Sequence, residues 1–152
     1  MSYNNDFKNI LVPIDGSEFS VRALKYAITI TNKFESNLIA LHIVPSTIKY
    51  EFFNSEENLE PNSPENMILQ SAYMEAQKWF DDIKEKLGVK FITEVLIAKE
   101  SIVKEIIAYS EREKIDLIII GTRGRSGLKK LLLGSIASGV VTYANCPVIV
   151  TK

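Results

Sequence analysis

Short aliphatic runs alternate with amphipathic stretches along most of the chain. Nearly continuous apolar runs bounded by turn-forming residues predict buried strands over residues 9–15, 37–44, 116–120 and 146–150. A looser pattern predicts a further strand over residues 89–97. Strands without regular polar alternation are typical of parallel sheets, in which both faces are covered.

The segments between these strands favour helices. Ala23, Ala27, Ile30 and Phe34 recur at intervals of three and four residues, which places them on one helical face, and Ser17 is a suitable N-cap. By the same criterion, further helices are expected over residues 64–87, 101–114 and 134–144.

Two details of the second expected helix can be tested. Its apolar stripe includes Tyr73 and Phe80 and predicts that both face the core, and Gly88 is a suitable residue to end it. The irregular segment before it, residues 45–64, is expected to form a long surface loop.

Strands that alternate with helices predict an open, doubly wound α/β fold with a parallel sheet and helices on both faces. The length of 152 residues fits one domain, and neither a repeat nor a linker divides it, so residues 1–152 are expected to form a single domain.

The composition narrows the choice of compartment and partner. A formal net charge of -1 gives no basic excess for nucleic acid or for a membrane surface. A single cysteine, Cys146, cannot form an internal disulfide, and the first residues lack the apolar core of a signal peptide. We therefore expect a cytoplasmic protein without nucleic-acid or membrane partners.

Ligands of such sheets bind beyond the carboxyl ends of the strands. Asp15, Ile43 and Gly121 all fall at or near such ends. If the first and fourth strands are neighbours, these residues converge on one crevice.

The segment from residue 121 to residue 135 combines glycines, cations and a helix start. Gly121, Gly124 and Gly134 permit close backbone approach, and Gly134-Ser135 opens the last helix, whose free N–H groups suit a phosphate. Positive charge is added by Arg123, Arg125, Lys129 and Lys130. The alternative interpretation is a long turn whose glycines satisfy geometry alone and whose cations are solvated.

The pattern Gly-x2-Gly-x9-Gly-Ser, formed by Gly121, Gly124, Gly134 and Ser135, resembles the nucleotide signature of ATP-binding members of the universal stress protein family. The resemblance extends from Asn9 to Val150 and is also carried by the segments at residues 10–17, 41–43, 132–135 and 145–150. Ala98 is a departure, because many members have glycine there, but it lies outside the signature.

The resemblance implies a five-stranded sheet in the order 3-2-1-4-5 and a homodimer formed through the C-terminal strand. It implies an ATP site, open also to AMP or ADP and to Mg²⁺ or Mn²⁺. The implied roles are nucleoside contact by Pro13, Ile14 and Asp15, adenine pairing by the Ile43 backbone, ribose and phosphate contact by Gly121, Thr122, Arg123 and Gly124, and phosphate binding by Gly134, Ser135 and Ile136.

Other sites find little support in the sequence. The Walker pattern, a Gly-x-Ser-x-Gly elbow and a zinc-type cluster are all absent. His42, the only histidine, lies in a buried strand and is expected to be a satisfied core residue rather than a general base. No catalytic or metal-binding residue is assigned.

The leading hypothesis is a regulatory adenine-nucleotide-binding protein with at most slow ATP hydrolysis. One alternative is a slow ATPase or self-phosphorylating enzyme that uses Ser126 or Ser135. Another is an interaction module that needs no ligand and dimerises through its exposed last strand.

Overall fold

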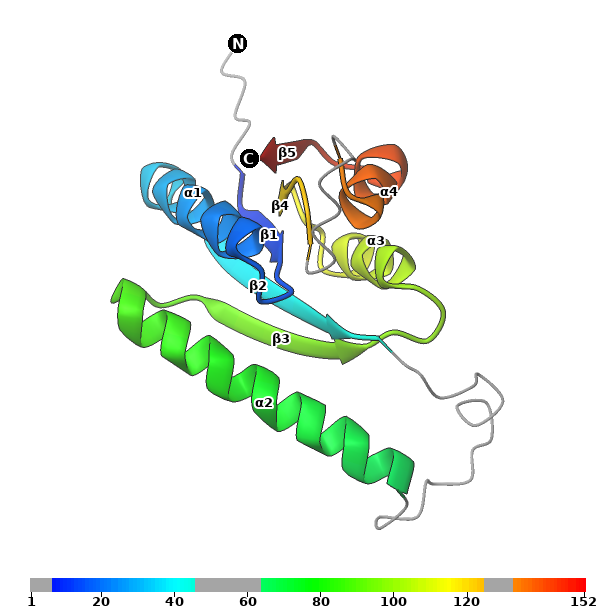
Figure 1. The fold of residues 1–152 in the computed structure, drawn as a ribbon. Coiled ribbons are helices and arrows are strands. Elements are labelled where there is room, and N and C mark those ends of the chain that lie inside the picture. Colours follow the sequence, from blue (N-terminus) through cyan, green and yellow to red (C-terminus); the bar gives the residue numbers. More distant parts are fainter. Residues whose placement is uncertain (1–6, 46–63, 125–132) are drawn as a thin grey trace.

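The computed structural model describes residues 7–45, 64–124 and 133–152. Strands and helices alternate along it (Figure 1). In chain order the elements are β1 (Asn9–Pro13), α1 (Glu18–Phe34), β2 (Asn37–Val44), α2 (Pro64–Leu87), β3 (Ile92–Ile97), α3 (Ile102–Arg112), β4 (Leu117–Gly121), α4 (Ser135–Tyr143) and β5 (Val148–Thr151).

The strands form one parallel five-stranded sheet in the order β3-β2-β1-β4-β5, which confirms the expected fold and strand order. β1 pairs with β2 on one side, where Pro13 lies opposite Leu41, and with β4 on the other. The strand order therefore changes direction at β1, and the segments that follow β1 and β4 meet at the same edge of the sheet.

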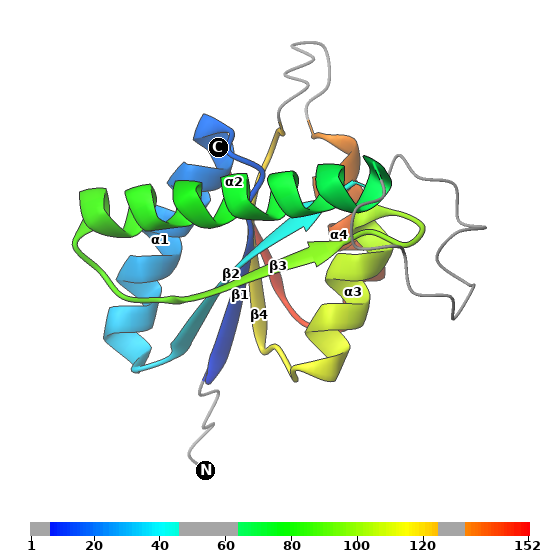
Figure 2. The ribbon, with the colours of Figure 1, turned by 90° about the horizontal axis from the view of Figure 1, so that it is seen from below.

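Two apolar cores cover the two faces of the sheet. Residues of β1, β2 and β4 whose side chains point to one face pack with α1 and α2 around Phe80, which is fully buried. Their neighbours point to the other face and pack with α3 and α4 around Ile106. Figures 1 and 2 show these two helical layers on either side of the sheet. The sheet is thus buried on both faces, as its aliphatic strands predict.

The structure corrects one expectation for α2. Tyr73 is 48% exposed, although the apolar stripe placed it in the core, whereas Phe80 is buried. The buried residues of the stripe, Ala76, Phe80 and Ile83, all follow Tyr73, so the packed face of α2 begins later along the helix than the apolar spacing does. Gly88 ends the helix as expected, with a φ of 61° and its N–H donating to the Lys84 carbonyl at 2.9 Å.

Several expectations concern residues that lie outside the described ranges, namely the loop between residues 46 and 63 and the centre of the glycine-bearing segment, residues 125–132. Within the described ranges, every helix is too short or too polar to traverse a lipid bilayer.

Candidate functional site

A cavity of about 250 Å³ opens where β1 and β4 end side by side. Its volume is near the lower end of those found for small-molecule sites, roughly 300 Å³ and above. All the residues that the sequence predicted to contact a ligand line this cavity: Pro13, Ile14, Asp15, Ile43, Gly121, Thr122, Arg123, Gly124, Gly134, Ser135 and Ile136.

Asp15 is held at the cavity by the turn between β1 and α1. Its Oδ1 accepts the Ser17 N–H at 2.9 Å, and Gly16 has a φ of 84°, which makes this turn favourable. The Asp15 carboxylate also lies directly against Gly124, because a Cβ added at Gly124 would be 2.7 Å from Oδ2. The segment after β4 therefore approaches Asp15 closely only because residue 124 has no side chain.

The other two glycines of the signature also stand at close approaches. A Cβ at Gly121 would be 2.9 Å from backbone atoms of Phe19 in the first turn of α1. The Gly134 N–H donates to the Thr122 carbonyl at 2.6 Å, and a Cβ at Gly134 would be 3.1 Å from the same oxygen. This hydrogen bond joins the two ends of the segment between β4 and α4, so the end of β4 and the start of α4 meet at the cavity.

The helix that starts at the cavity, α4, has no side-chain cap. Its N-cap is Gly134, its first turn has no acidic residue, and Ser135 is exposed at its first position. The free N–H groups of a helix N-terminus carry partial positive charge and are a favourable place for an anion. Glycine at the N-cap leaves this end open towards the cavity.

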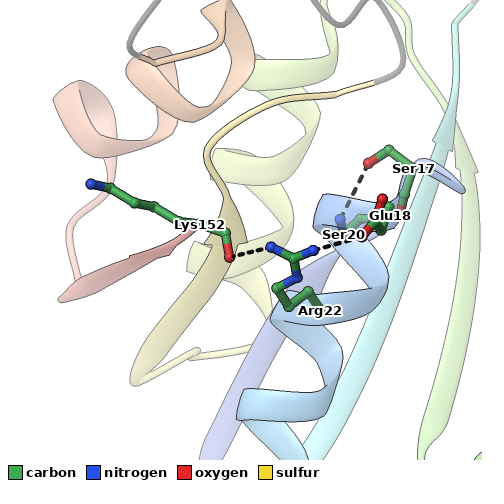
Figure 3. A network of polar contacts seen from close by, with 5 residues as sticks. All are labelled: Ser17, Glu18, Ser20, Arg22 and Lys152. Atoms are coloured by element: carbon green, nitrogen blue, oxygen red, sulfur yellow. Dashed lines mark hydrogen bonds and ion pairs between the residues drawn. The ribbon is translucent and has the colours of Figure 1, made fainter.

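The first turn of α1 differs in its cap and in its charge (Figure 3). Ser17 Oγ accepts the Ser20 N–H at 3.2 Å, and Glu18 supplies an acidic residue to the first turn. The Arg22 guanidinium pairs with the Glu18 carboxylate at 2.6 Å and donates to the Lys152 carbonyl at 3.1 Å. The N-terminus of α1 thus has a side-chain acceptor for the Ser20 N–H and an acidic residue of its own.

The inner wall of the cavity is apolar and includes residues that sequence reasoning assigned to the core or did not assign. Ile102 and Ile106 of α3 and Ala137 of α4 lie there beside Ile120 at the end of β4. Ile102 and Ile106 are four residues apart on one helical face, the same pattern that marks a core face. The sequence pattern therefore predicts that these side chains are buried but not that they line a cavity.

Arg123 lines the cavity, and its guanidinium lies 5.9 Å from the centre of the Phe19 ring, within cation–π distance. The described ion pairs do not include Arg123. This side chain lies against α1, whereas α3 and α4 carry the apolar wall. The other cations of the segment, Arg125, Lys129 and Lys130, lie outside the described residues.

Two residues were expected to be structural, and both have structural contacts, although His42 also lines the cavity. The His42 ring is half-buried, and its Nδ1 lies 2.7 Å from the Ile14 carbonyl oxygen. Trp79 packs against His42 with the ring centres 5.8 Å apart. Cys146 is half-buried beside the core under α3 and α4, and burial raises the pKa of its thiol. Among the described residues there is no cluster of potential metal ligands.

The comparisons with known proteins concern the family and the overall fold. The model of the universal stress protein family matches residues 6–152. Universal stress protein MJ0531 of Methanocaldococcus jannaschii is 36% identical over 148 residues, which is 97% of this chain and 84% of that protein. The solved structure of MJ0577 from the same organism superposes with a TM-score of 0.77 at 31% identity and covers 97% of this chain and 96% of its own.

A third relative was solved with a ligand. The universal stress protein from Archaeoglobus fulgidus in complex with dAMP has a TM-score of 0.65 at 21% identity, with coverage of 97% of this chain and 99% of that one. At this identity the likeness supports the fold alone. Sequence and fold nevertheless lead to the same assignment, and the chain belongs to the universal stress protein family.

Proposed function

We propose that this chain is a regulatory protein of the cytoplasmic stress response that binds an adenine nucleotide, ATP foremost, in the cavity at the ends of β1 and β4. The observation that carries the proposal is the meeting of Asp15, the three signature glycines and the open N-terminus of α4 around one cavity. Glycines at close approaches beside a helix N-terminus form the kind of cradle that phosphates occupy.

The two sides of the cavity suit the two ends of a nucleotide. The apolar wall formed by Ile102, Ile106 and Ala137 suits the flat base, with the backbone of Ile43 at its edge. The Asp15 carboxylate suits the hydroxyl groups of a ribose and would repel phosphates. The phosphates would then lie along Gly124 and reach the N–H groups of Ser135 and Ile136.

The ligand seen in a relative is consistent with this class of compound. The Archaeoglobus fulgidus protein was solved with dAMP, an adenine nucleotide. A divalent cation, Mg²⁺ or Mn²⁺, would arrive with the nucleotide, because no cluster of metal-ligating side chains is present in the described ranges.

The hydrogen bonds of the two candidate general bases, Asp15 and His42, favour nucleotide binding over ATP hydrolysis. Asp15 accepts a hydrogen bond from the Ser17 N–H, and His42 is engaged with the Ile14 carbonyl. A general base must reach the proton that it removes. Both groups make bonds that shape the turn after β1, and the remaining oxygen of Asp15 is the one proposed to face the ribose.

The direct test is calorimetry of the purified protein with ATP, AMP and GTP, together with mass spectrometry of any nucleotide released from it on denaturation. We expect binding of ATP and AMP in preference to GTP. Failure of all adenine nucleotides to bind at millimolar concentration would overturn the proposal.

The second part of the proposal is a homodimer through β5. This strand is an edge of the sheet, paired only with β4 within the described part of the chain. Apolar side chains are exposed on and beside it, with Ile149 41%, Val141 47% and Tyr143 67% exposed. An exposed aliphatic edge favours pairing with a second chain. Light scattering should give a dimer mass that Ile149→Lys reduces to the monomer mass, whereas a wild-type monomer would contradict the proposal.

A further inference from the structure

The chain leaves β1 at Ile14, and both peptide groups of this residue are held by β2. The Ile14 N–H donates to the Leu41 carbonyl at 2.8 Å, which continues the ladder between the strands. The Ile14 carbonyl, the next group along, lies 2.7 Å from Nδ1 of the His42 side chain. A histidine ring thus adds one bond to the β1–β2 ladder at the residue that lines the cavity.

The chemistry of this contact fixes the position of one proton. A carbonyl oxygen only accepts hydrogen bonds, so Nδ1 of His42 must carry the hydrogen. In the neutral ring this selects the tautomer protonated at Nδ1, with Nε2 as the unprotonated nitrogen. A protonated ring would keep the same bond, because it also has a hydrogen on Nδ1.

The ring is held in place from the α2 side. Trp79 meets the His42 ring in an edge-to-face arrangement with an interplanar angle of 70°. The Trp79 ring in turn packs against Phe80, which is fully buried, with the ring centres 5.2 Å apart. The His42 side chain therefore connects the core under α2 to the backbone of the cavity.

We propose that His42 is a positioning residue for the nucleotide site. The Ile14 carbonyl belongs to the peptide that continues into Asp15, so the bond from His42 fixes the plane from which the Asp15 side chain projects. From there Asp15 is held by the Ser17 N–H and lies against Gly124. Without the His42 bond this peptide would keep only the long bond from the Asp15 N–H to Ser20 Oγ at 3.4 Å, and Asp15 would be less firmly aligned with Gly124. The inference rests on the proposed nucleotide site.

The test compares two substitutions with the wild type. His42→Asn keeps an N–H donor at about the place of Nδ1, whereas His42→Leu fills the space without a donor. Affinity for ATP, measured by calorimetry on samples shown by circular dichroism to be folded, should fall about tenfold in His42→Leu, the size expected for one lost hydrogen bond. His42→Asn should stay within about twofold of the wild type.

The outcomes separate this inference from the function on which it rests. Absence of ATP binding by the wild type would refute the nucleotide site itself. A wild type that binds, with a His42→Leu variant of equal affinity, would refute the role of His42 alone. Equal losses in both variants would show that the ring and not the hydrogen bond is needed, and the proposal would be wrong.

A second measurement does not depend on a ligand. Because the chain has one histidine, nuclear magnetic resonance of ¹⁵N-histidine-labelled protein reports this ring without overlap. At alkaline pH we expect the hydrogen on Nδ1 and the unprotonated signal from Nε2. The opposite tautomer would exclude the bond to the Ile14 carbonyl.

Discussion

Helices α1 and α4 both start at the edge of the sheet where the cavity opens, but their N-termini are built differently. α1 is capped by Ser17, has Glu18 in its first turn and pairs that residue with Arg22 (Figure 3). α4 has a glycine as its N-cap, no side-chain cap and no acidic residue in its first turn. α3, which is capped by Ser101, resembles α1. The N-cap of α4 and its first residues, Ser135 and Ile136, line the cavity, whereas the capped α3 presents the apolar side chain of its first residue, Ile102, there.

This difference indicates a division of roles. A capped N-terminus contributes to folding stability, since its N–H groups are satisfied within the chain. An uncapped N-terminus forgoes that contribution and keeps its N–H groups available for an anion. Substitutions at α1 should therefore change stability, and substitutions at the start of α4 should change binding.

The largest effect is expected when α4 is made to resemble α1. In Gly134→Asp, the carboxylate would cap the helix and repel a bound phosphate, so ATP affinity should fall on the order of 100-fold. The free energy of unfolding should change by less than about 1 kcal/mol, because Asp is a favourable N-cap. Calorimetry and urea unfolding measure the two quantities.

Gly134→Ala is the matched control for this variant. It adds the same Cβ, 3.1 Å from the Thr122 carbonyl oxygen, but no charge. Its loss of affinity should be much smaller than that of Gly134→Asp. Equal losses would show that crowding, not the open helix end, explains the effect.

The next largest effect concerns how α4 is held in place without a cap. A Cβ added at Gly139 would be 2.8 Å from a methyl group of Val103 in α3. Gly139→Ala should therefore lower the free energy of unfolding by about 1–2 kcal/mol through overpacking, although alanine is the better helix former.

The sign of this effect should reverse when Val103 is shortened. In a Val103→Ala background the space is available, so Gly139→Ala should raise the free energy of unfolding by about 1 kcal/mol through its helix propensity. Urea unfolding of the four proteins completes the cycle. If the effect were the same in both backgrounds, the close approach of α3 and α4 would not be what fixes α4.

A smaller effect on binding is expected where Gly124, in the segment after β4, contacts Asp15 in the turn after β1. Gly124→Ala places a methyl group 2.7 Å from Asp15 Oδ2, so the carboxylate must move. ATP affinity should fall about tenfold, equivalent to about 1.4 kcal/mol. In an Asp15→Gly background the same substitution should have little further effect, and additive losses would contradict the contact.

The smallest effect is expected at the cap of α1. Ser17→Ala removes the acceptor for the Ser20 N–H and should lower the free energy of unfolding by about 1 kcal/mol. Ser17→Thr should retain most of the stabilisation, because threonine is also a favourable N-cap. The ATP affinity of the folded protein should stay unchanged in both variants. A loss of affinity in Ser17→Ala alone would contradict the assignment of stability to the N-terminus of α1 and of binding to that of α4.

Much of the fold could be predicted from local patterns. The buried strands are aliphatic runs, and Ser17 and Gly88 mark helix ends by simple rules. The strand order was implied by the family resemblance, because the aliphatic runs of β1 and β4 do not say which strands they pair with. Tyr73 shows the limit of periodicity, since a regular stripe does not reveal which of its residues will pack against the rest of the fold.

The site was predicted only in part, because some of its residues occur in recognisable local motifs and others do not. Asp15 and the glycines occur in short motifs, and the structure brings them to one cavity. Ile102 and Ile106 were missed because an apolar helical face has the same spacing whether it meets a core or a cavity. The contact of Phe19 with Gly121 and Arg123 joins residues about a hundred positions apart and leaves no local pattern.

The cavity draws its walls from both halves of the chain, with Asp15 from one and Gly124 and Gly134 from the other. A disordered chain does not have this cavity, so a nucleotide bound there would favour the folded state by mass action. At a free concentration of 100 times Kd the gain is about 2.7 kcal/mol. The melting temperature of the protein would then follow the nucleotide supply of its surroundings.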